Sequence, residues 1–182
     1  MVTVVDVDAG PSIVARRVEV SATPAQVFAL LANPQRLCEL DGLGAVRDVP
    51  VLGPERLEIG DSFTVSLQQS GMPYQATSTV TSLEVDKTIE WEDSYCRKWR
   101  WELSETVNGT TEVTESLDCG SAVVPLFDEM FGGDTDRNAS AITLSLHKLA
   151  ERFDHCDGPS ATDPRSPVCR ARWVSPNLKA AS

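Results

Sequence analysis

The sequence contains no run of about 18 consecutive apolar residues, the length that a membrane-spanning helix requires. Its first basic residue is Arg16, and the aspartates Asp6 and Asp8 precede it. A secretory signal would instead begin with positive charge, followed by a longer apolar stretch. We therefore expect a cytoplasmic protein without a transmembrane segment.

Basic residues are also scarce, because 16 Lys and Arg stand against 27 Asp and Glu, for a net charge of −11. Phosphate backbones are bound by clustered lysine and arginine, so this balance argues against nucleic-acid binding. It argues equally against an anionic membrane surface. The exception is the segment 159–182, which carries four basic residues and a single acid, Asp163.

Residue types that build metal and cofactor sites are few. The chain has two histidines, His147 and His155, and five cysteines without CxxC spacing. The grouping of His155 with Cys156 and Cys169 lacks the paired ligand spacing of a zinc site. The glycines of segment 42–44 lie between a helix and a strand, which is the wrong context for a dinucleotide site. We expect no metal and no cofactor.

A helix–helix corner follows the first strand. Residues 13–20 are typical of a strand, and Thr23, Pro24 and Gln26 then give a capping box with proline in the first helical turn. The Asn33-Pro34 pair ends that helix, because a residue before proline avoids helical angles. The same pair can start a second short helix.

The apolar period then changes twice. From residue 45 to 119 it is two, which predicts a meander of antiparallel strands with one solvent-facing side. After residue 120 it returns to 3.6. Residues 122–131 predict a helical turn or two, and the apolar stripe from Ala139 to Phe153 predicts a long helix that ends near residue 154.

The last 28 residues differ from the rest of the chain. Residues 155–182 hold four prolines and show no apolar period, which is typical of a flexible tail. We therefore divide the chain into a folded domain, residues 1–154, and a Pro-rich, basic C-terminal tail. Such a tail could bind a protein partner, and the sequence leaves the oligomeric state open.

This order of elements predicts an α+β fold, in which a curved antiparallel sheet of about six to seven strands surrounds the long C-terminal helix and the two short helices close one end. In segments 21–42, 57–91 and 99–116 and in the final helix, the sequence resembles the bacterial single-domain branch of the START-related polyketide cyclase/dehydrase superfamily (SRPBCC). The resemblance covers residues 13–154 and implies the helix-grip fold of the birch pollen allergen. It also implies a hydrophobic cavity between sheet and helix, and it brings no shared catalytic motif.

Strand alternation and helix periodicity define the side chains that face this cavity. Three tryptophans stand close together, although aromatic residues make up only 6% of the chain. The predicted ligand-binding residues are Phe28, Leu31, Phe63, Val65, Leu67, Tyr74, Trp91, Asp93, Tyr95, Trp99, Trp101, Glu115, Ile142 and Leu146.

Three of these residues are also candidate catalytic residues. Alternation turns the carboxyl groups of Asp93 and Glu115 inward, and an acid in a dry cavity has a raised pKa and can act as general acid or base. The Tyr95 hydroxyl could hydrogen-bond a ligand carbonyl. A shift of one residue in strand register would instead place both acids in solvent.

The leading hypothesis is a protein that binds a small hydrophobic or aromatic molecule, such as a lipid or polyketide, in this cavity. The first alternative is a polyketide cyclase or dehydratase that uses a cavity carboxylate or tyrosine. The second is a protein interaction module.

Overall fold

The structure is a computed structural model that describes residues 2–69, 71–120 and 135–154. The elements in these ranges are β1 (Val5–Val7), β2 (Ile13–Val20), α1 (Pro24–Leu31), η1 (Pro34–Glu39), β3 (Ser62–Gln69), β4 (Met72–Glu84), β5 (Thr88–Asp93), β6 (Lys98–Glu105), β7 (Thr111–Asp118) and α3 (Thr135–Asp154). None of the described helices is long and apolar enough to cross a membrane. The predicted helical turn at 122–131 and the predicted tail lie outside the described residues.

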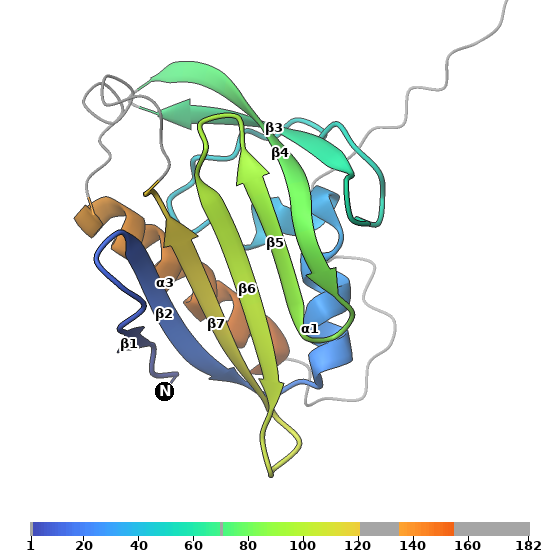
Figure 1. Cartoon of the computed structure of the whole chain (residues 1–182), viewed down its shortest axis with the longest axis vertical. Coiled ribbons are helices and arrows are strands. Elements are labelled where there is room, and N and C mark those ends of the chain that lie inside the picture. Colours follow the sequence, from blue (N-terminus) through green and yellow to red (C-terminus); the bar gives the residue numbers. More distant parts are fainter. Residues whose placement is uncertain (1, 70, 121–134, 155–182) are drawn as a thin grey trace, which may run out of the picture.

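The seven strands of the described ranges form one antiparallel sheet in the order β1-β2-β7-β6-β5-β4-β3. Figure 1 shows α1 and α3 on the same side of this curved sheet, with α3 behind β2 and β7. The predicted α+β helix-grip arrangement is therefore confirmed, including the strand number and the long C-terminal helix.

The helix–helix corner forms as its start signals indicate. The side chain of Gln26 accepts a hydrogen bond from the Thr23 amide at 2.9 Å, and the Thr23 hydroxyl accepts one from the Gln26 amide. Asn33 caps the next segment by accepting from the Gln35 amide at 3.0 Å. That segment, η1, is a 3₁₀ helix, and tight winding of this kind is common in runs this short.

The edge strand β1 was not predicted from the sequence. It spans three residues, too few to show a period of two, and it pairs with β2. An ion pair between Arg16 and Asp6, with 2.6 Å between Nε and Oδ1, joins the two strands.

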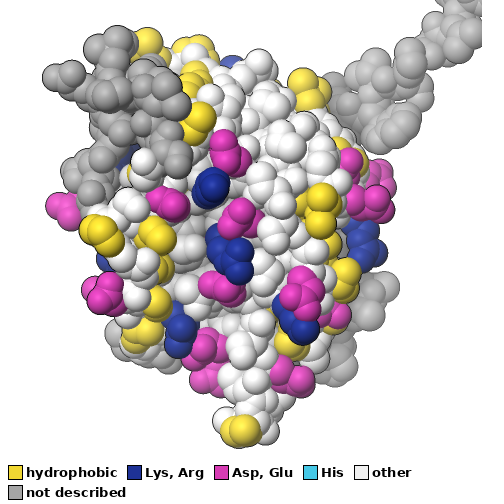
Figure 2. All heavy atoms as spheres, in the orientation of Figure 1, with side chains coloured by type: hydrophobic (Ala, Val, Ile, Leu, Met, Phe, Trp, Pro, Cys, Tyr) yellow, Lys and Arg dark blue, Asp and Glu magenta, His cyan; other side chains and the backbone are white. Residues whose placement is uncertain are grey.

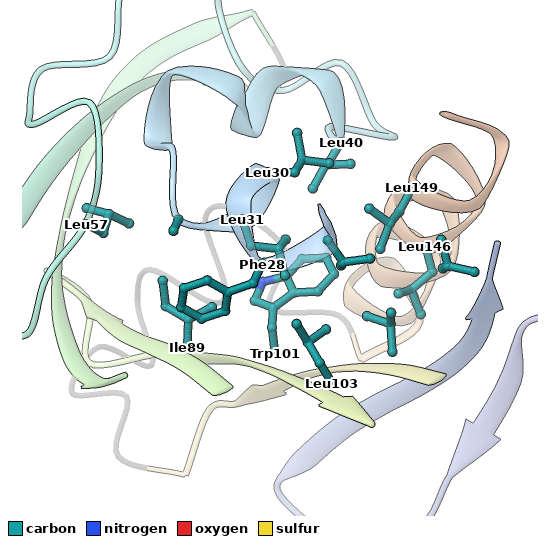
Figure 3. Close-up of a cluster of buried hydrophobic side chains, with 14 of the residues drawn as sticks. Phe28, Leu30, Leu31, Leu40, Leu57, Ile89, Trp101, Leu103, Leu146 and Leu149 are labelled. Atoms are coloured by element: carbon teal, nitrogen blue, oxygen red, sulfur yellow. The ribbon is translucent and has the colours of Figure 1, made fainter. Parts of the chain in front are cut away.

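Apolar side chains fill one end of the space between the sheet and the helices (Figure 3). Leu146 and Leu149 of α3 are fully buried there, and so are Leu31 of α1 and Ile89 of β5. The Trp101 ring lies among them, beside Phe28 in the view of Figure 3. We call this cluster, which comprises Phe28, Leu30, Leu31, Ile89, Leu103, Ile142, Leu146 and Leu149, the packed end.

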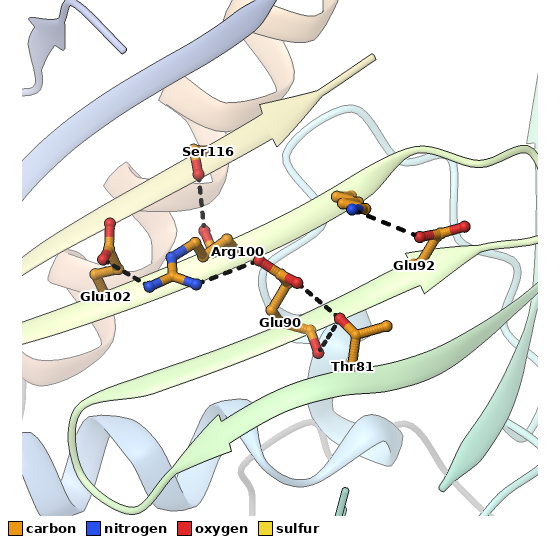
Figure 4. A network of polar contacts seen from close by, with 7 residues as sticks. Thr81, Glu90, Glu92, Arg100, Glu102 and Ser116 are labelled. Carbon is orange, nitrogen blue, oxygen red and sulfur yellow. Dashed lines mark hydrogen bonds and ion pairs between the residues drawn. The ribbon is translucent and has the colours of Figure 1, made fainter. Parts of the chain in front are cut away.

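The face of the sheet that points away from the helices carries intermixed acidic and basic side chains (Figure 2). Arg100 of β6 contacts Glu90 at 3.2 Å and Glu102 at 3.0 Å (Figure 4). Glu90 also accepts a hydrogen bond from the Thr81 hydroxyl at 2.8 Å. Because these polar residues alternate with inward Trp99 and Trp101, the strand register is the one that the sequence pattern predicted.

Candidate functional site

A pocket of about 240 Å³ lies between the sheet and α3, beside the packed end. Its walls come from β3 to β7, from one side of α3, and from the segment Leu37–Val46. Nine of the predicted ligand-binding residues line it: Phe63, Val65, Leu67, Tyr74, Trp91, Asp93, Trp99, Trp101 and Glu115. That they bind a ligand stays a prediction.

The sheet side of the pocket is an aromatic wall. Trp91 and Trp99 lie directly opposite each other on β5 and β6. The Phe63 ring meets Trp91 edge to face, with centroids 5.6 Å apart and an interplanar angle of 80°. Such a wall offers flat apolar surface on which a planar molecule can stack.

The helix side of the pocket consists of small or polar residues. Asn138, Ala141 and Ser145 recur at helical spacing and line the pocket. The neighbouring stripe of Ile142, Leu146 and Leu149 fills the packed end instead. The pocket therefore lies where the inward face of α3 carries its short side chains.

The loop after η1 covers part of the pocket and is tied to α3. The Asp41 carboxylate accepts hydrogen bonds from the amides of Leu43 and Val46, and the Asp41 carbonyl accepts one from Lys148 at 2.6 Å. Gly42 lies so close to α3 that an added Cβ would stand 2.1 Å from the Cβ of Leu144. Only glycine fits this approach.

Glu115 is the most deeply buried acid of the pocket, with 3% of its surface exposed. It lies opposite Trp101 across β6 and β7, and Ser145 hydrogen-bonds its carboxyl group. Within the described residues, Glu115 Oε2 and Trp101 Nε1 are the buried side-chain atoms that lack a hydrogen-bond partner. Burial raises the pKa of Glu115 well above its ordinary value of 4.5, although the Ser145 hydrogen bond partly lowers it. The protonated acid is thus favoured.

Asp93 is buried too, but its carboxylate is fully engaged. Its Oδ1 accepts from the amides of Tyr95 and Arg97, and its Oδ2 binds the Arg97 guanidinium at 2.8 Å. These contacts hold the tight turn between β5 and β6, in which Cys96 adopts a left-handed backbone with φ 61°. Asp93 therefore positions Arg97 at the pocket, whereas Glu115 keeps one carboxyl oxygen without a partner within the described residues. That either acid is catalytic stays a prediction.

A second polar region surrounds Tyr74, a residue of β4 that lies near the turn between β5 and β6. Burial raises the pKa of Tyr74 above its ordinary value of 10.0, and the positive charges of Arg97 and Arg137 partly offset this. Both arginines line the pocket and act on the same phenol, so they converge on this end. No three His, Cys, Asp or Glu side chains of the described ranges come together to hold a metal.

Five of the predicted ligand-binding residues lie outside the pocket lining. Phe28, Leu31, Ile142 and Leu146 belong to the packed end, because α1 and the bulky stripe of α3 leave no space there. Tyr95 points its hydroxyl to the Gln75 carbonyl at 3.2 Å, and its ring stacks beneath Arg97. These five therefore lie outside the pocket lining, although they adjoin it: the Tyr95 ring meets the Tyr74 ring with centroids 6.4 Å apart, and the other four share a buried cluster with Trp101.

Sequence reasoning missed several lining residues. Arg97 precedes β6, so strand alternation gave no direction for it. On α3 the missed lining residues are small or polar and lie beside an apolar stripe: Arg137, Asn138, Ala141 and Ser145. The contrast between these residues and the apolar stripe was the sequence feature that could have indicated the pocket. The rest of the lining consists of Leu37, Leu40, residues of the loop from Asp41 to Val46, Gln69, Ala76 and Ser78.

Comparison with known proteins gives a consistent result. A family described as polyketide cyclase / dehydrase and lipid transport matches residues 11–154. The uncharacterized protein Rv0088 of Mycobacterium tuberculosis is 39% identical over 157 residues, which cover 84% of this chain and 69% of that protein.

Solved structures share the fold at low sequence identity. A crystal structure from Rhodobacter sphaeroides has a TM-score of 0.63 at 16% identity and covers 85% of this chain and 100% of its own. Ara h 8.0201 has a TM-score of 0.51 at 13% identity, with 75% of this chain and 97% of its own covered. On the family match and the 39% identical relative, the chain belongs to the polyketide cyclase/dehydrase and lipid transport family of the SRPBCC superfamily.

Proposed function

We propose that this protein binds a small hydrophobic or aromatic molecule in the pocket between the sheet and α3. The observation that carries the proposal is the contrast inside one core, where a pocket walled by Phe63, Trp91 and Trp99 adjoins a cluster of buried apolar side chains. Membership of a family that includes cyclases, dehydrases and lipid transport proteins supports a small-molecule ligand.

The size of the pocket narrows the ligand class. Sites for drug-sized ligands measure about 300–1,000 Å³, and this pocket of about 240 Å³ lies just below that range. A compact aromatic compound suits it better than a sterol or a long acyl chain. The aromatic wall favours a flat molecule for the same reason.

The direct test is to identify what copurifies. The purified protein is extracted with organic solvent, and the extract is compared by mass spectrometry with that of Ala76→Phe. Ala76 lines the pocket from β4, so phenylalanine there fills the space, whereas Thr77→Phe places the same ring on the exposed face of the same strand. We expect a compound that is present in wild type and Thr77→Phe and absent in Ala76→Phe. Identical extracts from all three proteins would contradict binding in this pocket.

A second candidate function is an enzyme of the cyclase or dehydratase type, which the buried acid Glu115 favours. A protonated carboxyl in a dry pocket can donate a proton to a ligand oxygen and later recover it. Any turnover of a copurifying compound should then fall about 100-fold or more in Glu115→Gln, because general acid–base catalysis contributes at least that much. Unchanged turnover would remove Glu115 from the chemistry and leave binding as the function. The third hypothesis, an interaction module in which the sheet or the C-terminal tail binds a partner protein, stays a prediction.

A further inference from the structure

The two polar regions of the pocket lie at opposite ends of its aromatic wall. Arg97 and Trp101 are four residues apart along the sheet, or about 13 Å at 3.3 Å per residue. Trp101 lies opposite Glu115. On the other wall, Arg137 and Ser145 are eight residues apart on α3, or about 12 Å at 1.5 Å per residue. Ser145 hydrogen-bonds Glu115. The sheet and α3 thus independently give a similar distance between the arginine end and the Glu115 end of the pocket.

The arginine end can hold negative charge. Asp93 occupies one edge of the Arg97 guanidinium. Arg137 lines the pocket half-buried, and no ion pair of the described residues includes it. A half-buried cation that faces an apolar pocket is satisfied best by an anionic group of a ligand, and a guanidinium matches the planar carboxylate.

The Glu115 end of the pocket instead suits an uncharged group of a ligand. The lining cations Arg97 and Arg137 both lie at the other end, and the side chain that hydrogen-bonds Glu115 is the uncharged Ser145. A carboxylate of a ligand would meet a buried acid here without a compensating cation. A ligand hydroxyl can instead donate to the carboxyl oxygen Oε2, which has no partner within the described residues, and a keto oxygen can accept from the protonated carboxyl group.

We propose that the pocket selects a flat aromatic carboxylate whose far end carries an uncharged oxygen, with the carboxylate at Arg137, the rings on Trp91 and Trp99, and the hydroxyl or keto oxygen at Glu115. This rests on the proposed binding function and narrows it to one substrate class. An aromatic hydroxy acid or keto acid has this polarity, whereas a plain hydrocarbon, a fatty acid and a sterol do not.

Three probes of one ring system separate the contributions: naphthalene, 2-naphthoate and 6-hydroxy-2-naphthoate, each titrated into the full chain by calorimetry. We expect 2-naphthoate to bind about tenfold more tightly than naphthalene, because a charge-assisted hydrogen bond is added. The hydroxy compound should gain about a further fivefold from a neutral hydrogen bond.

Variants assign each gain to its residue. Arg137→Gln should remove most of the gain from the carboxylate, so that 2-naphthoate binds this variant only about twofold more tightly than naphthalene does. The control Arg56→Gln makes the same charge change at an exposed position outside the pocket and should alter nothing. Glu115→Leu should remove only the gain from the hydroxyl, whereas Glu115→Gln, which keeps a polar group, should retain most of it.

The outcomes separate this inference from the function beneath it. Equal affinity for the three probes, or a gain that survives loss of its own residue, overturns the inference and leaves binding intact. Failure of all three probes to bind contradicts the proposed function and the inference together. If Glu115→Leu does not fold, the comparison of the three probes in the wild type and in Arg137→Gln still decides.

Discussion

Helix α3 presents two stripes to the sheet, and they meet different surroundings. Ile142, Leu146 and Leu149 are fully buried against α1 and the strands, in the packed end. Asn138, Ala141 and Ser145 face the pocket. The backbone is the same helix throughout, so the difference comes from the side chains of each stripe and from the elements that each stripe meets. In this fold a stripe of small and polar side chains lines the pocket, while the neighbouring apolar stripe holds the helix to the sheet.

The largest effect should come from truncating the packed stripe. We expect Leu146→Ala to lower the free energy of unfolding by about 3 kcal/mol, because it leaves a cavity in a core with no room to relax. The same change at Leu37, which lines the pocket and is only partly buried, should cost less than about 1.5 kcal/mol. Urea unfolding with an unchanged m-value measures both. Equal losses would show that the two ends are not packed differently.

Adding volume gives the converse test on the same helix. Ala150→Leu forces side chains into the packed end, since Ala150 has no exposed surface, and should destabilise the protein by about 1–3 kcal/mol. Ala141→Leu places the same group in the pocket and should change stability by less than about 0.5 kcal/mol. Thermal unfolding of the pair checks this, and helix propensity cancels because the substitution is identical. A large loss at Ala141 would mean that the pocket is already filled.

The inward side chains of the strands could be predicted from the sequence because a pleated strand needs only a period of two. Phe63, Trp91, Trp101 and Glu115 all face the helices as alternation required. The same local rule predicted the capping box at Thr23. These features depend on near neighbours in the chain, which a sequence pattern records directly.

What separates pocket from core could not be predicted in the same way. Phe28 and Ile142 face inward like Trp91, yet they lie in the packed end, because that depends on where α1 and α3 sit over the sheet. Arg97 was missed since its direction follows from the Asp93 contacts in a tight turn. Such distinctions arise from contacts between distant elements, and apolar patterning alone does not encode them.

The acid at the boundary of pocket and core should make stability depend on pH. Glu115 keeps its proton in the folded state above pH 4.5, whereas an unfolded chain releases it near that value. The folded state therefore binds more protons in the window from about 4.5 up to the raised pKa, and stability falls as pH rises through it. The slope is at most about 1.4 kcal/mol per pH unit, and it vanishes above the window.

The measurement is the difference in unfolding free energy between wild type and Glu115→Gln over this pH range. Titrating groups that the two proteins share cancel in this difference. We expect wild type to lose stability relative to the variant as pH rises. Glu112→Gln is a control on the same strand, because the Glu112 side chain is 43% exposed and pairs with Arg17 outside the pocket. If wild type instead gains stability relative to Glu115→Gln as pH rises, Glu115 is ionised in the folded state. If Glu112→Gln gives the same pH dependence as Glu115→Gln, the burial of Glu115 has no energetic effect.

The smallest effect is expected on the outer face, where interactions are numerous and exposed. Arg100→Gln breaks its contacts with Glu90 and Glu102, but the Arg100 side chain is 37% exposed and water screens both pairs. We expect a loss below about 1 kcal/mol, which shrinks further in high salt, and no change in binding of any pocket ligand. Urea unfolding at low and high salt measures it, with Glu102→Gln as the matched removal of one partner. A loss of stability as large as that of Leu146→Ala would mean that ion pairs on the charged face stabilise the fold as much as the packed end does. The contrast between the two stripes of α3 would then not explain how the fold remains stable around an open pocket.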